Sequence, residues 1–250
     1  MSMEAAQRNA VQGRRLSVGL ARNEEEVLAA QRLRYCVFRE ELGAQLDCGD
    51  TGFDQDMFDP YCEHVIVKDE NLGEVVGTYR ILTPEGARKA GGFYSETEFD
   101  LARLRAILPA AVEVGRSCVR RDFRTGPAIL MLWSCVLRFV QSRGCEFLMG
   151  CASVGLQDGG HEAASLYAQF ASRHLGPDQW RVIPFHPLPL NELRTDLVVR
   201  VPPLVKGYVH LGAHICGEPA WDPGFRTADF FTLLPLSRMN PRFRRQLLGA

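Results

Sequence analysis

Short segments in which apolar and polar residues alternate, or in which apolar residues run together, recur along the chain and predict β-strands. The segments HVIVK at 64–68 and EVVGTYRIL at 74–82 flank a turn at 71–73, which predicts an antiparallel hairpin. Further strands are expected at 15–21, 112–119, 146–152, 180–185 and 228–234.

Other segments carry apolar residues at the spacing of a helix face. Asn23 precedes three glutamates, and this N-cap with an acidic first turn predicts a helix that ends near Gly43. Further helices are expected at 100–107, 128–141 and 162–175. The Asp- and Gly-rich segment 44–61, the basic segment 120–126 and the connection around Pro202 and Pro203 are expected to be loops.

The order of these elements predicts one mixed α/β domain over residues 15–236. The polar segment 1–14 is expected to be a disordered lead. Residues 237–250 are expected to be a basic amphipathic tail, in which Pro241 interrupts any helix.

Composition narrows the class of protein. The formal net charge is −1, so no global field favours nucleic acid as a partner. The sequence contains no run of ~18 apolar residues, so no membrane-spanning helix is predicted. The N-terminus lacks the apolar core of a secretory signal, so no such signal is predicted. The eight cysteines form no Cys-x-x-Cys pair and are expected to be reduced thiols of a cytoplasmic protein. The segment HLGAHIC is not expected to hold zinc, and no metal site is predicted.

A series of motifs follows this element order. LRYCVFREELG at 33–43 is followed by DQDMFDPYCEH at 54–64, GTYRIL at 77–82 and EVGRSCV at 113–119. The order resembles the GNAT fold, an α/β fold with a mixed, mostly antiparallel central sheet flanked by helices. The motifs resemble those of the acyl-homoserine-lactone synthases: an Arg-x-x-Val-Phe helix, an acidic loop and a Glu-x-x-Arg-Ser strand.

The resemblance to the ornithine N-acyltransferases, some of which are labelled hemolysin-like, is closer. It rests on GGFYSETEFDL, EVGRSCV, FLMGCAS, PPLVKGYVHLGA and TADFF, and it extends over about 16–236. It implies transfer of a long fatty-acyl group, with or without a 3-hydroxyl, from acyl-carrier protein to the α-amino group of ornithine, giving lyso-ornithine lipid. The donor is then a phosphopantetheine thioester, and no further cofactor is expected.

The basic turn RRDFRTGPA bears on the donor. In the wider GNAT fold a loop at this place donates backbone N–H groups to the pyrophosphate of coenzyme A, but here a proline follows Gly126 and has no N–H. A carrier protein presents one phosphodiester, so the loop needs fewer N–H donors to bind it. Arg120, Arg121, Arg124 and Gly126 are therefore predicted to bind the donor phosphate before a helix N-terminus, or else to form a plain basic turn.

Amide formation from a thioester requires that the amine lose a proton. Glu113 is the predicted general base, because apolar surroundings would raise its pKa. The alternative is a structural salt bridge between Glu113 and Arg116. Arg116 is predicted to hold either the acidic loop or the acceptor carboxylate.

The acidic loop is the predicted acceptor site. Asp56 and Asp59 would neutralise the ammonium groups of ornithine, with Arg34 and Arg80 holding the loop or a carboxylate. The alternative for the aspartates is a solvated turn.

Competing functions are another N-acyl amino-acid synthase, including an acyl-homoserine-lactone synthase, and a non-catalytic acyl-binding or membrane-active protein. The tail places four arginines beside apolar residues, which predicts weak peripheral contact with the inner membrane, or else a packed C-terminus.

Overall fold

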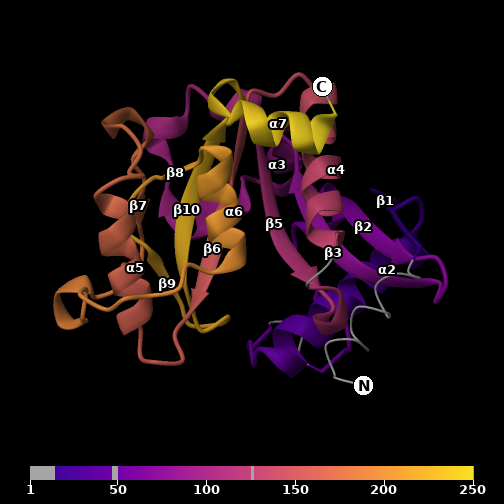
Figure 1. The fold of residues 1–250 in the computed structure, drawn as a ribbon, viewed down its shortest axis with the longest axis horizontal. Helices are drawn as coiled ribbons and strands as arrows, with labels where there is room; N and C mark the ends of the chain where they lie inside the picture. Colours follow the sequence, from indigo (N-terminus) through magenta and orange to yellow (C-terminus); the bar gives the residue numbers. More distant parts are fainter. Residues whose placement is uncertain (1–14, 47–49, 125–126, 250) are drawn as a thin grey trace.

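The computed structural model describes residues 15–46, 50–124 and 127–249, so the expected lead at 1–14 and Gly126 lie outside the described residues. An eight-stranded sheet forms the centre of the molecule (Figure 1). Its strands, in spatial order, are β1 (Leu16–Leu20), β2 (Glu63–Asp69), β3 (Glu74–Leu82), β5 (Ala111–Val119), β6 (Phe147–Gly155), β10 (Thr227–Pro235) and β8 (His214–Ile215), with β9 (Ala220–Asp222) also paired to β10. β5 and β6 run parallel, and the other strand pairings of this sheet are antiparallel. The mixed, mostly antiparallel α/β fold expected from the sequence is confirmed.

Helices cover both faces of the sheet. The expected first helix is α2 (Glu24–Tyr35), where the Asn23 side chain accepts a hydrogen bond from the Glu26 N–H, and it continues as a π-helix over Cys36–Glu41. α4 (Ala128–Ser142) and α5 (His161–Ala171) are also confirmed, within a few residues at each end. Leu132 and Val136 of α4 join the main core with Val119 of β5, whereas Leu33 of α2 packs in a separate cluster with the neighbouring Cys118. Because neighbouring residues of a strand point to opposite faces, α2 and α4 lie on opposite sides of β3 and β5.

Three helices were not expected, and each begins with a proline. They are α3 (Pro84–Ala90), α6 (Pro203–Leu211) and α7 (Pro241–Leu248). Proline is well tolerated in the first turn of a helix, where its missing N–H has no intrahelical partner to lose. The interpretation of Pro203 as part of a loop and of Pro241 as a helix breaker was therefore wrong, whereas Pro202 lies just before α6 as expected.

Two further expectations were also wrong. Residues 100–107 are not a helix: they contain the end of β4 (Phe99–Asp100) and a 3-10 turn at Ala102–Leu104, where the Asp100 side chain accepts from the Ala102 N–H. The strand expected at 180–185 is reduced to β7 (Ile183–Pro184), which pairs with β4 in a separate two-stranded sheet. The hydrogen bond to the Asp100 side chain limits the first segment. Pro184, which has no N–H to donate, limits the second.

The chain end packs against the body of the protein. α7 lies against α4, and Met239 and Leu247 are buried in the main core. Figure 1 shows this helix across the C-terminal end of α4.

The parallel strands separate in the middle of the sheet. Pairing between β5 and β6 runs from Ala111–Phe147 to Glu113–Met149 and ends there, after which the strands diverge (Figure 1). Gly150 follows at the point of divergence, where a Cβ atom would lie 2.2 Å from the Val114 carbonyl oxygen. The absence of a side chain at Gly150 permits this close approach.

Candidate active site

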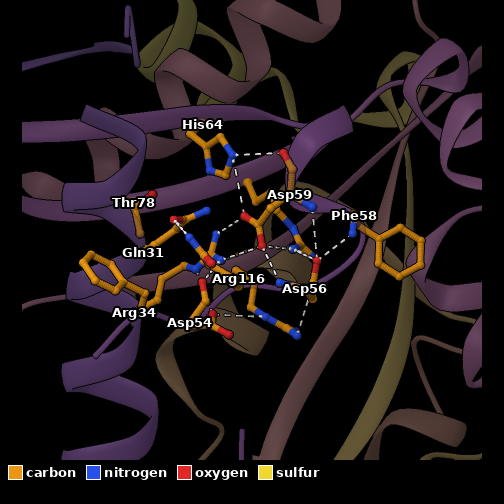
Figure 2. Close-up of polar contacts among 12 residues, drawn as sticks. Gln31, Arg34, Asp54, Asp56, Phe58, Asp59, His64, Thr78 and Arg116 are labelled. Atoms are coloured by element: carbon orange, nitrogen blue, oxygen red, sulfur yellow. Dashed lines mark hydrogen bonds and ion pairs between the residues drawn. The ribbon is translucent and has the colours of Figure 1, made fainter. Parts of the chain in front are cut away.

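A buried network of arginines and aspartates joins α2, the acidic loop and the strands β3 and β5 (Figure 2). Arg34 has no exposed surface; its guanidinium donates to Asp54 Oδ2 at 2.8 Å and to both oxygens of Asp59 at 2.9 Å. Burial opposes the charge on Asp59, but the Arg34 and Arg80 guanidiniums outweigh it and lower the pKa of that carboxyl. The prediction that Arg34 pairs with the acidic loop is confirmed.

Asp56 connects two more arginines to this Asp–Arg network. Its Oδ1 accepts from Arg80 at 2.6 Å and its Oδ2 from Arg116 at 3.1 Å, while Oδ1 also accepts from the Phe58 N–H. Arg80 reaches Asp59 as well, at 3.2 Å. Three arginines (Arg34, Arg80, Arg116) thus balance three aspartates (Asp54, Asp56, Asp59) in formal charge.

Arg116 owes its position to a β-bulge. Thr78 pairs with Cys118 and Arg80 with Gly115, so β5 carries one residue more than β3 over this stretch. Arg116 has a φ of 53°, a left-handed conformation that costs energy for a non-glycine residue. Its guanidinium lies 5.1 Å from the ring centre of Tyr94 and 4.6 Å from that of Phe225. Strain of this kind persists only where surrounding contacts hold it, and the network and the two rings supply those contacts.

A cavity of about 330 Å³, here called the β5–β6 cavity, lies where the two strands diverge. Glu113, Gly115 and Arg116 line it from β5, Cys151 and Ser153 from β6. Leu204, Phe225, Thr227 and Asp229 also line it, so it gathers residues from both halves of the chain.

Glu113 is a buried residue in the lining of this cavity. Its carboxylate accepts from the backbone N–H groups of Tyr94 and Ser95 at 2.6 and 2.8 Å and from the Ser95 hydroxyl. Burial raises the pKa of Glu113, and these hydrogen bonds offset part of that rise. The alternative of a structural salt bridge from Glu113 to Arg116 is therefore wrong, since Arg116 pairs with Asp54 and Asp56.

A second cavity of about 560 Å³, here called the acidic-loop cavity, lies beside the first. Asp56, Glu98 and Trp221 are among its lining residues. It shares four lining residues with the β5–β6 cavity: Tyr94, Arg116, Asp222 and Phe225. The two cavities are therefore neighbours, separated by side chains of these residues.

Glu98 and Asp229, here called the acid pair, were not singled out from the sequence. One oxygen of each carboxylate and the Cys151 sulfur lie within 4.8 Å of one another. Burial raises the pKa of Glu98 to about 8 and that of Asp229 to about 6. The Asp229 charge adds to the rise at Glu98, and the Asp222 charge adds to the rise at both carboxyls. Asp229 lies in the motif TADFF, and the apolar residues beside it were the available signal that this aspartate is buried on a strand.

The acid pair and Cys151 are also a group whose atom types would suit a cation. Burial holds the pKa of the Cys151 thiol well above its ordinary value, so the sulfur is a neutral and weak ligand.

The basic turn is differently arranged from the phosphate site that was predicted. Arg120 pairs with Glu74 and Asp122, and Arg124 pairs with Glu41. Arg121 is exposed and makes no ion pair with a described residue. None of the three lines either cavity, and Gly126 lies outside the described residues. Pro127 precedes α4 without a side-chain cap.

No helix within the described ranges has the length and apolar character needed to cross a membrane.

Comparison with known proteins places the chain among acyltransferases. The profile of the acetyltransferase (GNAT) domain matches residues 33–134. An L-ornithine N(alpha)-acyltransferase of Rhodobacter capsulatus is 36% identical, over 91% of this chain and 92% of its own. The enzyme of the same name from Brucella abortus is 34% identical, over 91% of this chain and 87% of its own.

Solved structures share the fold at low sequence identity. The AHL synthase LasI superposes with a TM-score of 0.55 at 14% identity, over 95% of this chain and 97% of its own. The N-acyl amino acid synthase FeeM, from uncultured soil microbes, gives 0.55 at 14% identity, over 94% of this chain and 95% of its own. The CoA-dependent acyl-homoserine lactone synthase BjaI gives 0.53 at 18% identity, over 94% and 88%.

Proposed function

Because the chain belongs to the L-ornithine N(alpha)-acyltransferase family and is an acyltransferase, we propose that it transfers a long fatty-acyl group from acyl-carrier protein to the α-amino group of L-ornithine. The product is lyso-ornithine lipid. The observation that carries the proposal is the divergence of β5 and β6 at a cavity whose lining includes the buried carboxylate of Glu113.

The phosphopantetheine thioester enters between the diverging strands. Beyond Glu113 and Met149 the backbone of β5 is no longer paired with β6, so its N–H groups on that side are free of the ladder. One such N–H donates to the oxyanion that forms when the amine attacks the thioester carbon. The thiolate of the pantetheine arm is the leaving group.

Glu113 accepts the proton of the attacking amine, directly or through a water. Its carboxylate is held by two backbone N–H groups and a hydroxyl, and its raised pKa brings it closer to the range in which a carboxylate removes protons efficiently. Each carboxylate oxygen has two lone pairs, so these bonds leave acceptor capacity for the amine.

The Asp–Arg network holds the acceptor side of the site. Arg34 has no exposed surface and donates its N–H groups to Asp54 and Asp59. It therefore positions these aspartates and does not contact the substrate. Arg116 borders both cavities, and its Nε–H, although within 3.4 Å of Asp54, makes no well-formed hydrogen bond. Arg116 and Arg80 therefore attract the α-carboxylate of the amino acid. Asp56 keeps both guanidiniums in place, and Asp59 also holds that of Arg80.

The donor is a carrier protein rather than free coenzyme A. Pro127 removes one backbone N–H at the start of α4, and only Arg121 of the basic turn has no ionic partner within the described residues. This arrangement suits a single phosphodiester and an acidic protein surface better than a pyrophosphate.

The enzyme works in the cytoplasm at the inner membrane surface, because its one-chain product must leave into lipid. The exposed arginines Arg242, Arg244 and Arg245 of α7 supply the contact with anionic headgroups. Since Met239 and Leu247 are buried in the core, they are not available to insert into the bilayer.

A transfer assay with the purified protein tests the function. Acyl-carrier protein and coenzyme A thioesters of one long fatty acid are each offered with a panel of amino acids and with S-adenosylmethionine, and products are identified by mass spectrometry. We expect N-acylornithine from the carrier-protein donor. Acyl-homoserine lactone from S-adenosylmethionine would select the alternative synthase, and no product with any acceptor would overturn the proposal.

A further inference from the structure

The acid pair sits where the two cavities meet. Glu98 lines the acidic-loop cavity and Asp229 lines the β5–β6 cavity, yet an oxygen of each lies within 4.8 Å of the other. The shared lining residues Tyr94 and Asp222 border the same junction. A small molecule that occupies the acidic-loop cavity and reaches toward the thioester therefore passes the acid pair.

Among the described residues, the acid pair differs from the aspartates of the Asp–Arg network in forming no salt bridge. Asp59 is held by two arginines, whereas the Asp229 carboxylate accepts from the Thr227 hydroxyl at 2.9 Å and feels the Arg116 charge only without direct contact. Both Glu98 oxygens are shielded from solvent and have no well-formed hydrogen bond among the described residues. Buried carboxylates are costly without partners, so their place beside an open cavity points to a cation that arrives with the substrate.

We propose that Glu98 and Asp229 bind the side-chain ammonium group of the acceptor amino acid and thereby make the enzyme specific for a diamino acid. The inference rests on the proposed function, in which the acceptor is ornithine. A primary ammonium presents three N–H donors, enough to reach both carboxylates and a neighbouring acceptor.

Two carboxylates suit the spectator ammonium better than the reacting one. A pair of negative charges stabilises the charged form of an amine and raises its pKa, which would keep a nucleophile protonated and unreactive. The reacting α-amine instead needs a single proton acceptor, and Glu113 is that group. The Ser95 hydroxyl contacts both Glu113 and the Cys151 sulfur, at 3.4 Å from the latter, so Ser95 and Cys151 stand between Glu113 and the acid pair. The two acidic positions are thus distinct places along one elongated acceptor.

The test compares L-ornithine with L-2-aminopentanoate, which has the same carbon chain but no side-chain amine. Wild type, Glu98→Gln and Asp229→Asn are assayed for kcat/KM with both acceptors. We expect wild type to favour ornithine, and each variant to lose about 30-fold or more with ornithine, because one partner of a buried charge pair is removed. The value for 2-aminopentanoate should change less than about threefold. Asp178→Asn, an exposed carboxylate outside both cavities, is the control for an unspecific charge change.

Equal losses with both acceptors would overturn the proposal, because the acid pair would then serve the chemistry or the fold. Calorimetric binding of each amino acid without donor gives a readout that does not need turnover. Wild type that binds ornithine no better than 2-aminopentanoate would also overturn it. Binding that prefers ornithine and depends on Asp229, but without acyl transfer, would leave this inference standing and sink the proposed reaction.

A bound metal is the competing occupant of the same three side chains. Protein dialysed against a chelator is expected to retain its preference for ornithine in full. Loss of that preference, restored by adding back a divalent cation, would show that the acid pair holds a metal and would overturn the ammonium proposal.

Discussion

Arg34 and Asp59 form a two-bonded ion pair, with both N···O distances at 2.9 Å, at a place where Arg34 has no exposed surface. The pair ties the first helix to the acidic loop, and Asp59 in turn holds Arg80 on β3. Three segments that are distant in sequence are thereby fixed around one carboxylate. The network fixes the positions of the side chains in the site, but its charges are buried. Buried charges are stable only while every partner is present.

Removing the Arg34 guanidinium should therefore destabilise the fold strongly. We expect Arg34→Ala to lower the free energy of unfolding by about 3–5 kcal/mol, since it leaves Asp54 and Asp59 buried without their main partner. Arg39 makes a single contact of the same length, 2.9 Å, with Asp50 at the surface, so Arg39→Ala should cost less than about 1 kcal/mol. Denaturant unfolding of both variants measures the difference, and equal costs would show that the network does not hold the fold.

Stability should also respond to pH through the acid pair. Folding raises the pKa of Glu98 from about 4.5 to about 8, so the folded state binds this proton more tightly than the unfolded state. The contribution of Glu98 to stability is then complete below about pH 4.5 and is lost as the pH rises through about 8. Glu98→Gln lacks this contribution and keeps only that of Asp229, whose pKa burial raises to about 6.

Thermal unfolding between pH 5 and 9 measures this effect. The melting temperature of wild type should fall relative to that of Glu98→Gln as the pH rises, by about 2–4 °C for each kcal/mol lost. A constant difference across this range would show that Glu98 titrates normally in the folded protein.

The sequence predicted the elements with strong local signals. Asn23 with its three glutamates, and the hairpin around 71–73, formed as expected because capping and turn chemistry act within a few residues. The helices that begin at Pro84, Pro203 and Pro241 were missed because proline has opposite meanings in the first turn and in the interior of a helix.

The site was predictable only in part, because only some of its residues lie together in one stretch of sequence. Arg34, Asp56 and Glu113 lie in motifs that a single stretch of sequence displays. Glu98, which precedes β4, and Asp229 of β10 come together only in the folded protein, and no local pattern reports that proximity. The pairing of Arg120 and Arg124 with distant glutamates likewise depends on tertiary contacts.

The role proposed for Glu113 predicts a loss in rate rather than in binding. Glu113→Gln should lower kcat by ~10² to 10⁴, because the amide cannot accept the proton of the amine. The change also turns an N–H₂ group toward one of the two backbone donors, Tyr94 N–H or Ser95 N–H, so unfolding of the variant must be measured. Ser95→Ala removes one hydrogen bond to the same carboxylate but keeps the base, and should cost less than about tenfold. Near-normal turnover of a folded Gln variant would remove Glu113 from the mechanism.

Donor binding should depend on Arg121 more than on its neighbours. Arg121→Glu should raise the Michaelis constant for acyl-carrier protein and leave that for ornithine nearly unchanged, because Arg121 is exposed and has no ionic partner in the described residues. The effect should weaken with salt, since exposed charges are screened over ~10 Å at 0.1 M. Arg88→Glu, on the exposed side of α3, is the control. Equal changes for both substrates would place the carrier protein elsewhere.

Membrane contact, as proposed, depends on the arginines of α7 and not on its apolar residues. Deleting 237–250 would uncover α4, because Met239 and Leu247 are part of the core, so substitution is the cleaner test. Changing Arg242, Arg244 and Arg245 together to Gln removes three exposed charges, each worth about 1 kcal/mol near anionic lipid. The affinity for phosphatidylglycerol vesicles, measured by co-sedimentation, should fall by about a hundredfold. The same change at Arg88, Lys89 and Arg105, which are exposed elsewhere on the protein, is the control and should lower the affinity little. Vesicle binding that survives the α7 changes would show that another surface of the protein meets the membrane.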